Sequence, residues 1–240
     1  MPTHLHSRAQ TAPSGPPVGD TLPMDRRTWG LKTLGWLASG SLLGAGHPNA
    51  TAADDSRFWQ LLAEGGCVAL MRHAATAPGI GDPPGFDLKQ CSTQRNLSDM
   101  GRAQARQWGA WFVERHVKVA EVRTSAWCRC KDTAQLAFGR YRVWSPLNSF
   151  FENDRQSAGQ TEDVVRFVQA MRTPHNVVLV THQVNITALT DQPNAMGEML
   201  LIRPSSRTAA TDSPSAKTRS GPAFEVLARL QGPSQTQRPQ

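Results

Sequence analysis

Several features that define other classes of protein are missing from this sequence of 240 residues. No C-x-x-C pair occurs, so a zinc site is not indicated and we expect no metal or other cofactor. The formal net charge is +7, but no run of Lys and Arg with interleaved aromatic residues appears, which argues against nucleic acid as a partner. Internal repeats and a second domain are also absent. The composition, 39% hydrophobic and 19% charged, is that of an ordinary globular protein.

The sequence also lacks an apolar run of the ~20 residues that a membrane-spanning helix needs. The apolar stretch 34–45 is shorter, and Arg26-Arg27 and Lys32 precede it. Small residues follow it, and the segment 50–52 (ATA) fits a signal-peptidase site with cleavage before Ala53. The paired arginines resemble a twin-arginine export signal. A general secretion signal is the closest alternative, and an uncleaved signal anchor fits the cleavage site less well.

These features predict how the chain is organised. Residues 1–23 are polar and rich in Pro and Gly, and we interpret them as a disordered extension or a misassigned start. Residues 24–52 are predicted to be the signal peptide, so we expect a periplasmic or otherwise exported protein with no stable membrane insertion after cleavage. Residues 53–232 form the predicted domain, with a polar loop at 204–222, and residues 233–240 a disordered tail. Nothing in the sequence indicates an oligomeric state.

Strand and helix patterns alternate within the predicted domain. The apolar runs at 67–71 and 176–181 are typical of strands that are buried on both faces of a parallel sheet. Ser98 is a good N-cap for a helix that runs to about residue 115. The alternation predicts an α/β fold, a three-layer sandwich with a mainly parallel central sheet and helices on both faces. The other predicted elements are strands at 117–124, 198–203 and 223–229, the last two as a terminal hairpin, and helices at 55–64, 128–138 and 161–171.

Four cysteines remain after the predicted cleavage. In an oxidising compartment one disulfide is plausible, most simply between Cys91 and either Cys128 or Cys130. The alternative is four reduced cysteines, with Cys67 in the core of a strand. The sequence leaves both open.

Arginine and histidine side chains follow three of the predicted strands. Arg72 and His73 come directly after the first buried strand, and His182 comes directly after the last. Arg129 follows the strand at 117–124. Because ligand sites in open parallel sheets gather beyond the carboxyl ends of the strands, we expect these four side chains to share one crevice.

Two arginines and two histidines around one point suit a tetrahedral dianion. Arginine pairs with phosphate oxygens through a planar fork of donors and stays charged. One neutral imidazole can attack phosphorus, while a second imidazole, if protonated, adds positive charge. Phosphoryl transfer requires mainly positioning and charge stabilisation, so arginines can take the place of a metal. A histidine nucleophile would divide the hydrolysis into two displacements through a covalent intermediate.

Four segments resemble the motifs of the histidine phosphatase superfamily, branch 1, which includes the phosphoglycerate mutases. Segment 70–76 (LMRHAAT) is similar to the Arg-His-Gly-x-Thr signature. Segment 91–105 (CSTQRNLSDMGRAQA) resembles the Leu-Ser/Thr-x-x-Gly-x-x-Gln-Ala motif at the start of a helix. Segments 124–134 (TSAWCRCKDTA) and 178–186 (VLVTHQVNI) resemble the second-arginine and second-histidine motifs. The segments occur in the order that the family uses and together span about residues 56–190.

This resemblance implies a phosphoglycerate mutase-like fold and assigns roles to the residues. It implies His73 as the nucleophile, and Arg72, Arg129 and His182 as the phosphate pocket. Thr76 either bonds a phosphate oxygen or caps a turn, and the two are equally expected. Gln183 replaces the usual glycine after the second histidine, and Ala74 replaces the usual glycine after the nucleophile.

Family members usually carry an acidic proton donor between the second arginine and the second histidine. Glu152 is our preferred donor and Asp154 is the alternative, because the apolar pair Phe150-Phe151 would desolvate the Glu152 carboxyl and raise its pKa. We expect Arg95 and Asn96 to order the loop before the helix at 98–115 rather than to touch a substrate.

The loop at 77–90 is dense in Gly, Pro and Asp and lies where a substrate would enter, so we expect it to shape specificity. The Glu-rich phosphoglycerate-binding segments of the mutases are missing, which disfavours mutase activity. We therefore expect a metal-independent phosphoric monoester hydrolase, similar to a histidine acid phosphatase, acting in the cell envelope on a phosphorylated small molecule or envelope sugar. The alternative is a catalytically silent module of the same fold that binds a phosphate ligand.

Overall fold

The computed structural model describes residues 50–172, 174–203 and 224–233. The chain divides into two units, residues 1–45 and 46–240, and the described residues all belong to the second unit. The predicted extension 1–23, residues 24–49 of the predicted signal peptide, the predicted polar loop 204–222 and residues 234–240 of the predicted tail lie outside the described residues.

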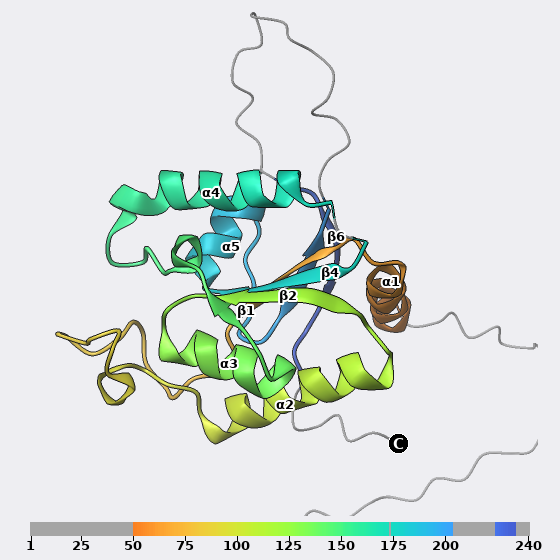
Figure 1. Ribbon diagram of the computed structural model, residues 1–240. Coiled ribbons are helices and arrows are strands. Elements are labelled where there is room, and N and C mark those ends of the chain that lie inside the picture. Colours follow the sequence, from red (N-terminus) through yellow and green to blue (C-terminus); the bar gives the residue numbers. More distant parts are fainter. Residues whose placement is uncertain (1–49, 173, 204–223, 234–240) are drawn as a thin grey trace, which may run out of the picture. The chain divides into compact units, whose positions relative to one another are not determined.

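Six strands form one sheet in the order β3-β2-β4-β1-β5-β6 (Figure 1). Strands β3, β2, β4 and β1 are parallel to one another, β5 is antiparallel to β1, and β6 is antiparallel to β5. The strands are β1 Val68–Arg72, β2 Val119–Thr124, β3 Arg142–Val143, β4 Asn176–Thr181, β5 Met199–Ile202 and β6 Val226–Leu230. The predicted mainly parallel sheet is confirmed, and β5 and β6 pair as the predicted hairpin strands.

Helices cover both faces of this sheet. In Figure 1, α4 and α5 lie above the sheet, whereas α2 and α3 lie below it. The helices are α1 Ala50–Glu64, α2 Asp99–Glu114, α3 Cys128–Phe138, α4 Ser157–Ala170 and α5 Gln183–Thr190, with short 3₁₀ turns η1 Cys91–Thr93, η2 Ser145–Leu147 and η3 Asp154–Gln156. The predicted three-layer α/β sandwich is therefore confirmed. Helix α1 begins within the predicted signal-peptidase site.

Two hydrophobic clusters show how the sequence produces these layers. Successive side chains of a strand point to opposite faces of the sheet. In β1, Ala69 and Met71 belong to the cluster that contains Trp108 of α2, whereas Val68 and Leu70 belong to the cluster that contains Val164 of α4. This explains why the run at 67–71 is continuously apolar, since both faces of the strand are covered.

The N-terminus of α2 is fixed by a predicted cap. Ser98 accepts a hydrogen bond from the Gly101 amide on its side-chain oxygen at 3.1 Å, which satisfies a backbone donor that the helix itself leaves free.

Two elements, β3 and α5, lack a sequence signal. Strand β3 has only two residues, both exposed, and α5 has only eight residues, about two turns, which is too short for helical periodicity to emerge.

Candidate active site

The three strands that precede the predicted site residues are neighbours in the sheet, in the order β2, β4, β1. The His73 amide donates to the Thr181 carbonyl at 3.0 Å, and the Ser125 amide donates to the Val180 carbonyl at 3.1 Å. These bonds hold together the segments that leave the three strand ends. As a result the rings of His73 and His182 lie with their centroids 5.5 Å apart, in an edge-to-face arrangement.

His73 is buried, with 3% of its surface exposed, and its two ring nitrogens have different roles. Nδ1 lies 2.9 Å from the Ala74 carbonyl oxygen, and because that oxygen only accepts, Nδ1 carries the proton. Nε2 is then left with its lone pair. Burial, followed by the positive charge of Arg129, lowers the pKa of His73 to about 3. The ring is therefore neutral at pH 7, which is the state a nitrogen nucleophile requires.

His182 is held through its Nε2 atom, whereas His73 is held through its Nδ1 atom. Its Nε2 lies 2.8 Å from the Ser125 hydroxyl and 3.5 Å from the Cys130 thiol, and the Trp127 ring contacts it edge-on at a centroid distance of 5.1 Å. Burial, and next the nearby His73, lowers the pKa of His182 well below its ordinary value. The free protein thus holds His182 neutral, and positive charge at the site comes from arginine instead.

Three arginines surround the histidine pair, one more than expected. Arg72 donates through Nη1 to the Asn194 carbonyl at 2.7 Å, and the Arg95 guanidinium donates to the Gly79 carbonyl. Burial first, and then neighbouring arginines, lower the pKa of Arg72 and of Arg95. Arg95 was expected to order the loop rather than to contact a substrate. In the structure it lines the same cavity as His73 and His182. The Nε atoms of Arg72, Arg95 and Arg129 are all buried without a hydrogen-bond partner.

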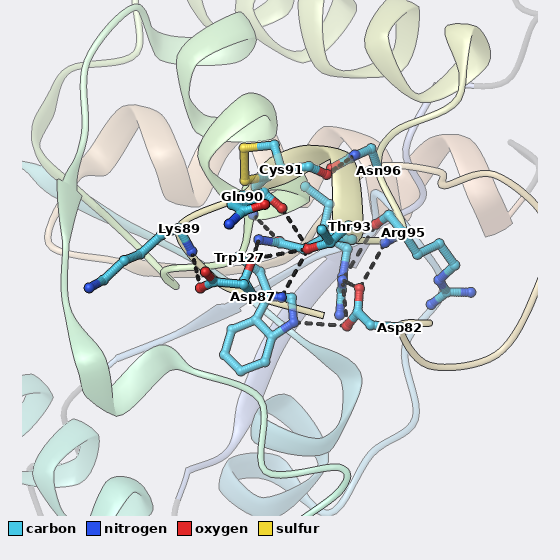
Figure 2. The surroundings of a disulfide bond; sticks show 12 residues. Asp82, Asp87, Lys89, Gln90, Cys91, Thr93, Arg95, Asn96 and Trp127 are labelled. Atoms are coloured by element: carbon cyan, nitrogen blue, oxygen red, sulfur yellow. Dashed lines mark hydrogen bonds and ion pairs between the residues drawn. A yellow bond between two sulfur atoms is a disulfide. The ribbon is translucent and has the colours of Figure 1, made fainter. Parts of the chain in front are cut away.

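Asp82, in the loop at 77–90, is a site residue that the sequence did not indicate. Its side chain is 4% exposed, and its two oxygens accept from Arg129 Nη1 at 2.8 and 3.0 Å. The same carboxylate accepts from the Trp127 indole at 2.9 Å and from the Arg95 amide at 2.8 Å, as Figure 2 shows. Burial raises the pKa of Asp82, but the hydrogen bonds outweigh it, and the pKa lies below its ordinary value. Asp82 is therefore ionised, and its carboxylate fixes the orientation of Arg129.

A disulfide joins this loop region to α3. Cys91 of η1 is bonded to Cys128, one of its two expected partners (Figure 2), and Cys128 directly precedes Arg129 in the chain. Gln94 adds a hydrogen bond, since its side-chain oxygen accepts from the Cys128 amide at 2.9 Å. The other two cysteines, Cys67 and Cys130, are free and buried.

The start of α2 holds the segment that follows the nucleophile. The Ser98 amide and hydroxyl both donate to the Ala75 carbonyl, at 3.0 and 3.2 Å, and the Gln104 side-chain oxygen accepts from the Ala75 amide at 3.1 Å. Gly101 allows this approach, because a Cβ atom at that position would lie 1.8 Å from the Ala75 carbonyl oxygen. The Ser-x-x-Gly-x-x-Gln spacing of the predicted motif thus places three residues of α2 and its cap against the backbone N–H and C=O of one residue, Ala75.

A cavity of about 860 Å³ opens from the histidine pair. Of the two candidate proton donors, Glu152 lines this cavity, whereas Asp154 lies outside its lining at the start of η3. Both are exposed, and Phe151 is itself 60% exposed, so the two phenylalanines do not withdraw Glu152 from water as expected. Gln183 lines the cavity at the first turn of α5.

Two other predicted residues lie away from the cavity. Thr76 is buried and forms a β-bridge with Leu97, and its hydroxyl donates to the Met196 sulfur at 3.6 Å. It does not line the cavity. Asn96 donates from its side chain to the Cys91 carbonyl at 2.6 Å, which orders the loop as expected. Within the described part of the chain, no group of three His, Cys, Asp or Glu side chains is placed to hold a metal ion.

Residues 68–148 match the model of the histidine phosphatase superfamily (branch 1). The predicted resemblance to this superfamily is confirmed over these residues. The matched segment includes Arg72, His73 and Arg129, and the sheet adds His182 to them from outside it. No curated protein matches the sequence. None of the described helices is long and apolar enough to cross a membrane.

Solved structures with a similar chain trace include three phosphatases. A candidate phosphohistidine phosphatase, SixA, from Agrobacterium tumefaciens is 18% identical, with a TM-score of 0.45, over 70% of this chain and 98% of its own. A mycobacterial glucosyl-3-phosphoglycerate phosphatase is 16% identical, with a TM-score of 0.43, over 57% of this chain and 92% of its own. A candidate α-ribazole-5′-P phosphatase from Escherichia coli is 16% identical, with a TM-score of 0.42, over 57% of this chain and 90% of its own.

Proposed function

We propose that this chain is a phosphomonoesterase that forms a phosphohistidine on His73 and uses no metal. The observation that carries the proposal is the convergence of three arginines, Arg72, Arg95 and Arg129, on the cavity that contains His73, whose Nε2 keeps its lone pair. Three guanidinium groups around one cavity favour an anionic ligand rich in acceptor oxygens. A phosphate group supplies those oxygens, and the arginines supply the charge for which other phosphatases use a metal.

The proposed reaction has two displacements. In the first, His73 Nε2 forms a bond to phosphorus as the bond to the ester oxygen breaks, and Glu152 gives its proton to the leaving oxygen. In the second, Glu152 takes a proton from water, the water oxygen attacks phosphorus, and the bond from phosphorus to His73 breaks. His73 returns to its neutral form with Nδ1 still donating to the Ala74 carbonyl. Glu152 is preferred to Asp154 as the acid because it lines the cavity.

We propose that the reaction takes place in the cell envelope, on a phosphorylated small molecule or an envelope sugar. The Cys91–Cys128 disulfide supports this location, because disulfides persist mainly in oxidising compartments. Export by the twin-arginine route predicts that a change of Arg26-Arg27 to Lys-Lys traps the protein in the cytoplasm. Fractionation of cells that express the two versions checks it, and export of the variant would contradict this route.

The central test is hydrolysis of p-nitrophenyl phosphate by the purified mature chain in the presence of a chelator. His73→Asn keeps a donor near the position of Nδ1 but removes the nucleophile, so we expect turnover to fall by at least ~10³-fold. His116→Asn, a change to an exposed histidine outside the cavity, is the matched control and keeps full turnover. Brief exposure to a labelled phosphomonoester should leave acid-labile, base-stable label on His73. Equal turnover in the two variants would reject the proposal.

The same assay separates the silent-module alternative from the enzyme. A silent module would bind inorganic phosphate through Arg129 without any His73-dependent turnover or label. The enzyme shows both binding and turnover. Glu152→Gln should slow alkyl phosphates more than p-nitrophenyl phosphate, because the poorer leaving group depends more on the donated proton. Asp154→Asn is the matched control for that comparison.

A further inference from the structure

Two of the most exposed apolar side chains in the described part of the chain stand at the mouth of the active-site cavity. Ile80 is 90% exposed and Phe151 is 60% exposed, and both line the cavity. Val113, 75% exposed on α2, lies elsewhere. Single exposed apolar residues are ordinary, but two that line the same cavity offer an apolar surface that a ligand can cover.

The apolar surface continues inward from this mouth to the catalytic centre. Phe86 and Trp127 lie with ring centroids 5.9 Å apart, and the Trp127 ring contacts His182. Phe150 and Val184 line the same cavity. A ligand with its phosphate at the two histidines would therefore meet rings and aliphatic chains along its way out to solvent.

The charges of the cavity give the same indication. Arg72, Arg95 and Arg129 are the only Arg or Lys side chains among the described residues that line it, and all three belong to the phosphate end. The acidic side chains Asp82 and Glu152 also line it. Asp82 is engaged by Arg129 at the phosphate end, so a leaving group with a second phosphate or a carboxylate would face Glu152 without a free cation to pair with, which disfavours such substrates.

We infer that the substrate is a phosphate monoester of an apolar alcohol, whose hydrocarbon part lies against Phe86, Trp127, Phe150, Ile80 and Phe151. The inference rests on the proposed function and narrows its substrate class. A cavity of about 860 Å³ is large enough for a phosphate and a hydrocarbon group of several carbons. Transfer of that hydrocarbon from water to the apolar wall supplies binding free energy that a sugar, with its hydroxyls, does not gain.

The test uses ethyl, butyl and hexyl phosphate, because the basicity of the leaving oxygen is nearly constant along this series. Burial of each added methylene should raise kcat/KM about two- to fourfold, and hexyl phosphate should exceed ethyl phosphate by at least about tenfold. Glucose 6-phosphate should be a poorer substrate than hexyl phosphate. A flat or falling series, with His73-dependent turnover intact, would overturn the inference and leave the phosphatase assignment standing.

Variants at the mouth locate the effect. The double variant Ile80→Ser/Phe151→Ser should lower the ratio of kcat/KM for hexyl phosphate to that for ethyl phosphate several-fold. Val113→Ser, at a comparably exposed apolar residue on α2, should keep the parent ratio. A double variant with the parent ratio would overturn the placement of the hydrocarbon on Ile80 and Phe151.

Binding of ethylphosphonate and hexylphosphonate, measured by calorimetry on the same protein, separates the two proposals. These compounds cannot be hydrolysed, so their dissociation constants do not depend on turnover. Tighter binding of hexylphosphonate, reduced in the mouth double variant, supports the apolar subsite even where no phosphomonoester is hydrolysed, and the phosphatase proposal alone then fails. Equal binding of the two phosphonates overturns the subsite.

Discussion

Asp82 places a negative charge in a cavity proposed to bind a phosphate dianion. Its contacts explain how the carboxylate and the phosphate can both be accommodated. The carboxylate uses one guanidinium nitrogen of Arg129, Nη1, while Nε of the same side chain has no partner. Asp82 therefore holds Arg129 through Nη1 without engaging its Nε. The negative charge also offsets part of the mutual repulsion of three arginines, which would otherwise oppose their burial together.

Removal of this carboxylate should affect catalysis more than phosphate affinity. We expect Asp82→Ala to lower kcat about 10- to 100-fold, because Arg129 loses the bonds that orient it toward the transition state. Inhibition by inorganic phosphate should stay as strong or become stronger, because the pocket gains net positive charge. Steady-state kinetics with phosphate as the inhibitor measure both. Asp87→Ala, at a carboxylate of the same loop outside the cavity, is the control, and an unchanged kcat in Asp82→Ala would contradict the role.

The sequence predicted the site residues that follow strands but not Asp82, which lies in a loop. Arg72, His73 and His182 could be placed together because a parallel sheet brings the ends of its strands to one edge. Asp82 and Arg95 enter the site through the fold of an irregular loop, and no periodicity or strand end fixes where such a loop leads. Asp82 occurs between Gly81 and Pro83, a context that predicts a turn and nothing more.

At the scale of elements, the contact between α2 and the segment after His73 depends on one glycine. We expect Gly101→Ala to destabilise the protein and to lower kcat, because its methyl group would overlap the Ala75 carbonyl and push that backbone away from α2. The free energy of unfolding should fall by roughly 1–3 kcal/mol, the range for overpacking in a core. Urea unfolding and steady-state assays measure the two effects.

The matched control is Gly159→Ala in α4. No atom lies within 4 Å of the position that its Cβ would take, and alanine favours a helix over glycine by roughly 0.5–1 kcal/mol. The control should therefore be neutral or slightly stabilising and keep full turnover. Similar losses in the two variants would show that the contact between α2 and Ala75 has no special role.

The Cys91–Cys128 disulfide is the second feature of the elements that we expect to stabilise the fold. It closes a loop with a sequence separation of 37, for which the loss of chain entropy in the unfolded state corresponds to about 3–4 kcal/mol. A reductant should lower the free energy of unfolding of the parent by about this amount, and it should have no effect on the double variant Cys91→Ser/Cys128→Ser. Urea unfolding with and without reductant measures it. A parent that is insensitive to reduction would contradict a stabilising role.

The predicted elements agree with the structure where the sequence carries repeated local signals. The strand at 176–181 and the helix at 128–138 coincide with β4 and α3, and a continuous apolar run marks the strand. Helix α4 begins at Ser157, before the predicted 161, since its first turn is polar and does not take part in the apolar stripe. The choice of Cys128 over Cys130 as the partner of Cys91 also needed the three-dimensional fold, because the two lie on the same first turn of α3.

At the scale of the whole molecule, the fold neutralises both histidines by burying them. A phosphate dianion is thus expected to meet two uncharged imidazoles and three arginines. The same burial links stability to pH, because the unfolded chain binds protons on these imidazoles near pH 6.5, whereas the folded chain holds the pKa of His73 at about 3 and that of His182 well below its ordinary value. Protonation therefore favours the unfolded state, and stability falls as the pH decreases through 6.5.

This linkage gives a measurable slope. Each of the two histidines should lower the free energy of unfolding by up to about 1.4 kcal/mol per pH unit below pH 6.5. The double variant His73→Asn/His182→Gln keeps a donor near His73 Nδ1 and near His182 Nε2 but does not titrate, so it should lose less stability than the parent between pH 7 and pH 5. Urea unfolding at the two pH values measures the difference. His116→Asn, which changes an exposed histidine, should retain the parent slope, and a double variant with the parent slope would show that the buried pair is not the source.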